Sequence, residues 1–279
     1  PELPEDNLLL EPYARRTAPC VAYSTYTLLK RDPSAVVAVT PADIVINDIE
    51  LFRKTLSSAL NYAESNPVLM TLGIQPSCPD TEYGYIQVTG GKEACKKNEP
   101  VKVKTFTEKP SQEIAELFFK SGEFFWNSGI FVWQASVIRE EMERYIPEIT
   151  RLFDGWEGAL GSPAETVFIE RAYTDCIKLS IDYGVMEKTD RAWIYPVHFG
   201  WSDIDSWENF YSNVGKKDAD GNIANTQKDI LQKSSGNIIL SKNKEKLIVL
   251  RGLENFIVAD TDDVLLVCPR DDKQYKELA

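Results

Sequence analysis

The chain has 279 residues, of which 43% are hydrophobic and 27% charged, a composition typical of a globular protein with one or two domains. Its 31 basic and 43 acidic residues give a net charge of −12, which repels polyanions and argues against a nucleic-acid partner. No apolar run approaches the roughly 18 to 20 residues that cross a bilayer, so we expect no membrane contact and a cytoplasmic location.

Segments with strand and helix patterns alternate over the first part of the chain. Residues 35–40 are expected to form a short buried strand, which ends in a proline-containing loop with Asp43. A helix is predicted next, because apolar residues recur on one helical face from Ile49 to Leu60. "VLMTLGIQP" and "YGYIQV" indicate further strands, and "VKVKTFTEKP" alternates in polarity up to its closing proline.

The alternation continues to about residue 210. Ser111 is expected to cap a helix that ends near Gly122, and "WNSGIFVWQASVIREEMERYI" indicates a strand followed by a helix. "SPAE" at 162–165 predicts another helix, with Ser162 as its N-cap. This pattern favours a layered α/β fold with a largely parallel sheet and ligand sites beyond the carboxyl ends of the strands.

The pattern changes after residue 235, where short β runs separated by turns replace the helices: "GNIILS", "KLIVLRG", "ENFIVADT" and "DVLLVCP". No internal repeat is evident in these runs. We predict a large α/β domain over residues 1–215, a polar linker over 216–234 and a small β-rich domain, in the form of a short solenoid, over 235–279.

Few common catalytic motifs are present. The chain has one histidine, His198, which we interpret as structural, and it contains no GxSxG, HExxH or GxGxxG pattern. Serine-hydrolase chemistry, zinc proteolysis and dinucleotide binding therefore have no motif to support them. The remaining candidates for chemistry are acidic, amide and lysine side chains at the ends of predicted strands.

The stretch "TFTEKP" has the densest group of polar residues. Glu108 can accept hydrogen bonds from vicinal sugar hydroxyls, and the ammonium of Lys109 can pair with a phosphate, although a solvated turn is the alternative. Asn127 is the one amide in the apolar run "FFWNSGIFVW", where it is either a ligand amide or a turn residue. Gly84 either lets the backbone approach a sugar ring or marks a bulge.

Two aspartates follow strand-like segments that are far apart in the sequence. Asp43 and Asp203 can face one cleft, and two carboxylates completed by phosphate oxygens and water suit Mg²⁺. Asp205, by contrast, begins the stretch Asp-Ser-Trp-Glu and is interpreted as the N-cap of the following helix.

Taken together, the motifs resemble the sugar-1-phosphate nucleotidyltransferases, and most closely the guanylyl branch of that family. The matching segments, in order, are "EPYARRTAP", "TPADIVI", "PDTEYGYI", "FTEKP", "WNSGIFVW", "SIDYGVMEK", "WSDIDSW" and "GLENFIVADTDDVLLVC". The resemblance implies a Rossmann-like nucleotide-diphospho-sugar transferase fold with residues 1–215 as the nucleotidyltransferase domain. It also implies an enzyme that transfers GMP from GTP to mannose 1-phosphate, giving GDP-mannose and pyrophosphate.

The resemblance also implies a role for individual residues. The catalytic group would be Lys109 with Asp43 and Asp203, and the two aspartates would bind Mg²⁺. The implied substrate-binding residues are Gly84, Glu108, Asn127, Asp182 and Glu187, and the implied nucleotide-binding residues are Glu11, Arg15 and Thr17.

The chain departs from the family pattern in several places. The glycine-rich triphosphate loop has no counterpart here and would lie upstream of Pro1, so we expect this chain to be part of a longer protein. Arg16, Ile44 and Asp205 stand where the pattern usually has Asn, His and Gly. Two alternatives therefore remain open: a related enzyme for another base or sugar, and a non-catalytic regulatory homologue. A homodimer is also left open.

Overall fold

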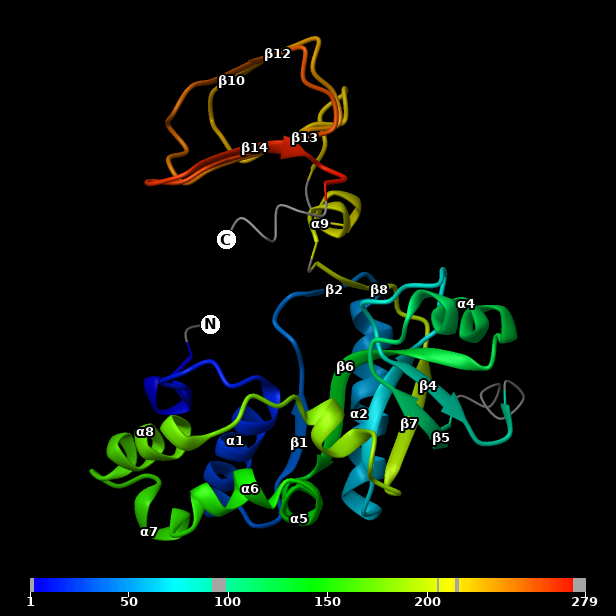
Figure 1. The fold of residues 1–279 in the computed structure, drawn as a ribbon, viewed down its shortest axis with the longest axis vertical. Helices are drawn as coiled ribbons and strands as arrows, with labels where there is room; N and C mark the ends of the chain where they lie inside the picture. The colour runs from blue at the N-terminus through cyan, green and yellow to red at the C-terminus, as the bar shows by residue number, and fades with distance from the viewer. Residues whose placement is uncertain (1–2, 92–98, 205, 214–215, 273–279) are drawn as a thin grey trace. The chain divides into compact units, whose positions relative to one another are not determined.

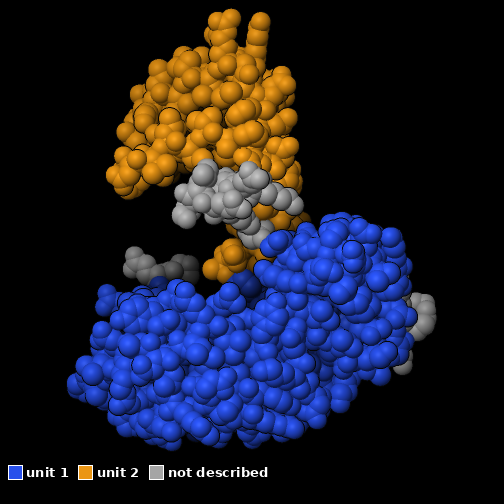
Figure 2. Space-filling view, viewed as in Figure 1, with its two compact units in different colours: residues 1–41, 48–199 blue, residues 42–47, 200–279 orange. Residues whose placement is uncertain are grey.

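A computed structural model describes residues 3–91, 99–204, 206–213 and 216–272 of the chain. The chain divides into two compact units (Figure 2), residues 1–41 with 48–199, and residues 42–47 with 200–279. The main chain thus passes into the second unit at Gly200, ahead of the boundary that the sequence places at residue 215. No helix in the described ranges combines the length and the apolar character needed to cross a membrane.

Unit 1 is built on a six-stranded sheet with the order β1-β6-β3-β7-β5-β4. Its strands are β1 (Val36–Val39), β3 (Leu69–Ile74), β4 (Tyr85–Val88), β5 (Val101–Thr107), β6 (Phe124–Gln134) and β7 (Ala192–Val197). The sheet is mixed, because β6 runs antiparallel between β1 and β3 while β3 and β7 pair in parallel. The prediction of a largely parallel sheet is therefore wrong for most neighbouring pairs: alternation of strands and helices does not determine the direction of a long strand such as β6.

Helices surround this sheet in two groups (Figure 1). α2 (Ile49–Ser65) contacts β1 and β6, and α4 (Gln112–Ser121) also contacts β6. The second group contains α1 (Thr17–Arg31), α5 (Ala135–Tyr145), α6 (Pro147–Thr150), α7 (Trp156–Ala159) and α8 (Glu165–Asp175). Short helical turns are η1 (Glu5–Asn7), η2 (Arg151–Phe153) and the π-helix η3 (Asp182–Met186).

The starts and ends of several helices follow local capping chemistry. The carboxylate of Asp48 accepts the backbone N–H of Leu51 at 2.9 Å, so α2 begins where the sequence predicted. α4 lies between Ser111 and Gly122, also as predicted, and Gly122 has the left-handed conformation of a helix C-terminus. α8 begins at Glu165, later than predicted, because Ser162 forms a turn in which its hydroxyl accepts the N–H of Ala164.

Unit 2 contains a two-stranded ribbon, a helix and a parallel solenoid. Its elements are β2 (Ile44–Ile46), β8 (Trp201–Asp203), α9 (Trp207–Asn213), β9 (Ile223–Ala224), β10 (Asp229–Gln232), β11 (Ile238–Ser241), β12 (Ile248–Arg251), β13 (Phe256–Asp260) and β14 (Leu265–Pro269). β9, β11 and β13 pair in parallel in one sheet, and β10 and β12 pair in parallel in another. The segment 216–234, predicted as a linker, thus contributes β9 and β10, because apolar residues such as Ile223 are buried in the coils.

The solenoid contains a repeat that the sequence analysis did not find. Gly221-Asn222-Ile223 and Gly236-Asn237-Ile238 occupy equivalent turns, with Ile223 paired to Ile238. The side chain of Asn237 donates to Oδ1 of Asn222 at 2.9 Å and accepts the N–H of Phe256 at 2.9 Å. These bonds span 15 and 19 residues, so the coil length changes between turns and gives no constant period in the sequence.

Candidate functional site

Polar side chains of unit 1 gather at one end of the sheet. In the register of β4 with β5 and β6, the residue that precedes Tyr85 lies between Glu108 on one side and Asn127 on the other. That residue is Gly84, whose carbonyl accepts the backbone N–H of Asn127 at 2.8 Å. The strand pairing therefore brings together three residues that the sequence predicted to bind substrate.

Gly84 leaves room for a carboxylate. A Cβ added at this position would lie 2.4 Å from Oε2 of Glu108 and 3.4 Å from Cβ of Asn127. Any larger residue would push the carboxylate away, so the glycine allows a close approach. An approach of the Gly84 backbone to a sugar ring stays a prediction.

Glu108 is a perturbed acid in this cluster. Its Oε2 is buried and has no hydrogen-bond partner in the described part of the chain. Burial raises the pKa of Glu108 to about 7, the charges of Asp182 and Glu187 add to the rise, and Lys109 opposes it. A buried acceptor without a donor is costly, and a ligand hydroxyl would satisfy it.

The carboxamide of Asn127 is held at both ends. Its Oδ1 accepts the hydroxyl of Thr71 at 2.9 Å and the N–H of Gly129 at 3.3 Å. Its Nδ2 donates to Oδ1 of Asp182 at 2.9 Å. Thr71 is completely buried on β3 and was missed by the sequence analysis, although a polar residue within the apolar run "VLMTLGI" was a signal for it.

Asp182 begins the π-helical turn η3, and Glu187 is the residue that ends it. In η3, the N–H of Glu187 donates to the carbonyl of Asp182 at 3.0 Å, the wide spacing of a π-helix, which often occurs at functional sites. Oε1 of Glu187 accepts the backbone N–H of Glu108 at 2.8 Å. Burial raises the pKa of Asp182, and the hydrogen bond from Asn127 opposes that rise. Both predicted residues therefore join the cluster.

Lys109 lies at the exposed edge of this cluster. Its ammonium is 3.9 Å from a carboxylate oxygen of Glu82, and both side chains are more than half exposed, at 52% and 58%. Such a pair contributes about 0 to 1 kcal/mol, so the ammonium can move to an incoming anion at little cost. The backbone of Lys109 has φ 43°, a left-handed conformation that is unfavourable for a residue with a Cβ.

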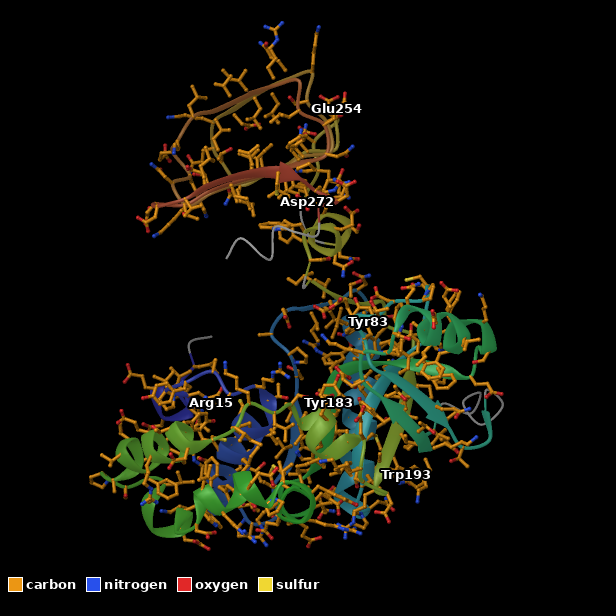
Figure 3. The ribbon with its side chains drawn as sticks, in the orientation of Figure 1. Arg15, Tyr83, Tyr183, Trp193, Glu254 and Asp272 are labelled. Atoms are coloured by element: carbon orange, nitrogen blue, oxygen red, sulfur yellow. The ribbon has the colours of Figure 1, made fainter. Side chains whose placement is uncertain are left out.

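The predicted nucleotide-binding residues lie near the joint between α1 and α8. The guanidinium of Arg15, labelled in Figure 3, donates to the carbonyls of Tyr173 and Thr174 at 2.9 and 3.1 Å. Thr17 accepts the N–H of Ile181 through its hydroxyl at 2.9 Å. These bonds tie the start of α1 to the last turn of α8 and to the residue before η3, and a role in nucleotide binding remains a prediction.

The third of these residues, Glu11, is exposed and lies within electrostatic range of Cys20 and of the buried Tyr173. Burial raises the pKa of Cys20 to about 11, and the charge of Glu11 contributes.

Tyr183, which is labelled in Figure 3, was missed by the sequence analysis. Burial raises the pKa of Tyr183, Glu108 adds to the rise and Arg16 opposes it, so this exposed ring lies within electrostatic range of the carboxylates. Its place between Asp182 and Gly184 was the available signal.

Of the two aspartates predicted to bind a metal, Asp43 immediately precedes β2 and Asp203 ends β8, both in unit 2. β2 and β8 are antiparallel with Ile44 opposite Asp203, and the N–H of Ile204 donates to the carbonyl of Asp43 at 2.9 Å. No group of three or more acidic, histidine or cysteine side chains suited to a metal occurs within the described ranges. Carboxylates suit a hard cation whose other ligands are phosphate and water oxygens, but the register sets Asp203 opposite Ile44 and not opposite Asp43, so a shared metal site stays a prediction. Asp205, predicted as an N-cap, falls outside the described residues.

Comparison with known proteins gives matches along most of the chain. The family model described as Nucleotidyl transferase matches residues 4–219. The chain is 36% identical over 268 residues to the alginate biosynthesis protein AlgA of Pseudomonas aeruginosa, covering 95% of this chain and 54% of that protein. It is 36% identical over 280 residues to the mannose-1-phosphate guanylyltransferase of Salmonella montevideo, covering 97% and 57%. The chain thus spans about half the length of the relatives it matches.

A solved structure from Thermus thermophilus, described as a mannose-1-phosphate geranyltransferase, has a similar fold. The TM-score is 0.79 at 28% sequence identity, and the match covers 97% of this chain and 76% of the other. The predicted layered α/β fold with a β-rich C-terminal part is therefore confirmed.

Proposed function

The chain belongs to the nucleotidyl transferase family, and from that premise we propose that the protein transfers GMP from GTP to mannose 1-phosphate, giving GDP-mannose and pyrophosphate. The proposal rests on one observation above all: the unpartnered Oε2 of Glu108 lies against Gly84, with the movable ammonium of Lys109 next to it in the chain. Relatives named mannose-1-phosphate guanylyltransferase support the choice of base and sugar.

The sugar end of the site has complementary hydrogen-bonding groups. Oε2 of Glu108 accepts a hydrogen bond, and the N–H of Asn127 that does not face Asp182 can donate one. A sugar hydroxyl can do both at once, so adjacent hydroxyls of a pyranose suit this pair. The missing Cβ at Gly84 lets the Glu108 carboxylate lie close to the backbone, in the position from which it would meet the ring.

The phosphate end must overcome the negative charge of the cluster. Three carboxylates stand near the sugar, and a phosphate adds further negative charge. With a pKa of about 7, Glu108 is protonated in roughly half of the molecules at neutral pH, which reduces the repulsion. Lys109 supplies the compensating cation at the edge of the site.

In the proposed reaction, a phosphate oxygen of mannose 1-phosphate forms a bond to the α-phosphorus of GTP, and the bond from that phosphorus to the bridging oxygen of pyrophosphate breaks. The attacking oxygen is already an anion, so no general base is needed. The residues of the chain therefore act by orienting the sugar and neutralising charge. Asp43 and Asp203 would bind Mg²⁺, which neutralises negative charge on phosphate oxygens when it is bound.

The test is a pyrophosphate-release assay with the whole protein and Mg²⁺. We expect turnover with GTP and mannose 1-phosphate and much less with ATP, UTP or CTP, or with glucose 1-phosphate. Glu108→Ala should abolish the selectivity among sugars and leave the binding of GTP intact. Turnover with another base or sugar would identify a related enzyme instead, and tight binding without pyrophosphate release would indicate the regulatory homologue.

Location and assembly complete the proposal. Because GTP and sugar phosphates are metabolites of the cytoplasm, the reaction is placed there. A homodimer remains a prediction, and light scattering on the whole protein measures it directly.

A further inference from the structure

We propose that Asp182 is a positioning residue that acts through Asn127. It fixes the orientation in which the carboxamide of Asn127 meets the sugar. The inference rests on the proposed function, since it concerns the binding of a sugar phosphate at the same site. It assigns to Asp182 an indirect role, in place of the direct sugar contact that the family resemblance implies.

The hydrogen bonds around Asn127 allow one orientation of its carboxamide. Two donors, the hydroxyl of Thr71 and the N–H of Gly129, point at Oδ1, and one acceptor, the carboxylate of Asp182, faces Nδ2. If the amide were flipped, Nδ2 would face the N–H of Gly129 and Oδ1 would face a carboxylate. The Thr71 hydroxyl could adapt by donating to the carbonyl of Ile130 at 3.1 Å, so it does not decide the orientation. The N–H of Gly129 at 3.3 Å and the carboxylate of Asp182 at 2.9 Å therefore decide it, and the shorter, charge-assisted bond to Asp182 is the stronger of the two.

This orientation determines what Asn127 can offer a ligand. An amide oxygen has two acceptor sites and an amide nitrogen has two hydrogens. Both acceptor sites of Oδ1 are used, and one hydrogen of Nδ2 is directed at Asp182. Among the bonds of the described residues, the second hydrogen has no partner. Asn127 therefore presents a donor, next to the acceptor of Glu108, and a flipped amide would place two acceptors side by side.

The turn that carries Asp182 also positions Glu108. The N–H of Ile181, just before Asp182, is bound by Thr17, and the N–H of Glu187 is bound by the carbonyl of Asp182. Glu187 in turn accepts the backbone N–H of Glu108 at 2.8 Å. One π-helical turn thus holds both halves of the donor and acceptor pair, which explains why the widened turn occurs at this place.

A double-mutant cycle tests the inference. Mannose 1-phosphate binding to the whole protein is measured by calorimetry for Asp182→Ala, Asn127→Ala and the double variant, with Asp190→Ala on the same segment as the control. We expect Asp182→Ala to weaken binding about tenfold and to raise the KM for mannose 1-phosphate but not for GTP. In the Asn127→Ala background, Asp182→Ala should change binding less than about twofold, because the residue acts through Asn127.

A conservative variant separates positioning from charge. In Asp182→Asn the new amide oxygen can still accept from Nδ2 of Asn127, so binding should stay within about threefold of the reference protein. The inference would be overturned if the losses of affinity in the two single variants multiplied in the double variant. It would also be overturned if Asp182→Asn bound mannose 1-phosphate as weakly as Asp182→Ala.

A measurement without ligand keeps this test apart from that of the proposed function. Side-chain amide NMR of the free protein should show one slowly exchanging NH₂ group for Asn127, and that group should lose its protection in Asp182→Ala. An unchanged Asn127 signal in Asp182→Ala overturns the inference even if no sugar phosphate binds. A reference protein that shows the NMR effect but binds no sugar phosphate contradicts the proposed function alone.

Discussion

Oε2 of Glu108 lies 2.4 Å from the point where a Cβ on Gly84 would stand. Real Cβ atoms do not approach an oxygen so closely, so the carboxylate keeps its position only because residue 84 has no side chain. The same oxygen has no hydrogen-bond partner among the described residues, which makes the contact between these two residues central to the proposed sugar site.

Gly84→Ala should therefore displace the Glu108 carboxylate and leave the fold intact. The atom that must move is the end of a flexible side chain, so the free energy of unfolding should change by about 1 kcal/mol or less. The KM for mannose 1-phosphate should rise roughly tenfold or more. Gly158→Ala is the matched control, because a Cβ there meets no atom within 4 Å. Equal KM values for both variants would contradict the role of Gly84.

Glu108 should make the folded protein less stable as the pH rises. Its pKa is about 7 in the folded state against 4.5 for an ordinary glutamate, so the folded state holds a proton that the unfolded state has lost between these values. The contribution of Glu108 to stability is then highest below pH 4.5 and falls up to pH 7, by at most about 3 kcal/mol. Glu108→Gln should reduce the slope, because only the contribution of Asp182, which has the same sign, then remains from this cluster, and urea melts at pH 5 and pH 8 measure it. A variant with the same slope as the reference protein would exclude Glu108 as its source.

Lys109 should matter for turnover and little for stability. Lys109→Ala should lower kcat/KM for mannose 1-phosphate on the order of 10²-fold, whereas the lost pairing with Glu82 costs about 0 to 1 kcal/mol. Lys109→Gly should lose the same activity as Lys109→Ala. Its free energy of unfolding should be about 1 kcal/mol higher than that of Lys109→Ala, because glycine tolerates φ 43°. Lys104→Ala, on an exposed position of β5, is the control. A large stability loss with normal kinetics would make Lys109 a structural residue.

Asp43 and Asp203 should bind one divalent cation together in the presence of GTP. Mn²⁺ is a suitable probe, because its electron paramagnetic resonance signal reports binding directly. Asp43→Asn and Asp203→Asn should each weaken Mn²⁺ binding at least about tenfold, since each removes a charged ligand. Asp263→Asn, an exposed position in the same unit, should not. Binding unaffected by either substitution would refute the proposed metal site.

Asn237 should be essential for the solenoid. It is completely buried, donates to Asn222 and to the carbonyl of Leu253 at 2.9 Å each, and accepts the N–H of Phe256. Asn237→Ala leaves these partners unsatisfied and should cost about 3 kcal/mol. The exposed Asn243→Ala should cost less than about 0.5 kcal/mol. Chemical denaturation followed by circular dichroism compares the two variants, and equal midpoints would contradict this assignment.

Local patterns in the sequence predicted much of the secondary structure. The apolar face from Ile49 to Leu60 located one helix and the pair Ser111 and Gly122 another, because helical periodicity and helix ends depend on residues only a few positions apart. Glu108 and Asn127 were identified for a related reason, since a polar residue directly after an alternating strand and a single amide within an apolar run are both visible in the sequence itself. Thr71 was missed because its partner lies 56 residues away.

The sequence by itself determined the type of fold, the elements and the set of polar residues that could carry the chemistry, all of which depend on composition, periodicity and motif. The tertiary structure decided the antiparallel course of β6, the stacking of the Gly-Asn-Ile turns and the use of Asp182 as the partner of Asn127. Each of these depends on strand register or on bonds between distant segments. Such contacts form only when the packing of the whole unit is satisfied, so no local pattern specifies them.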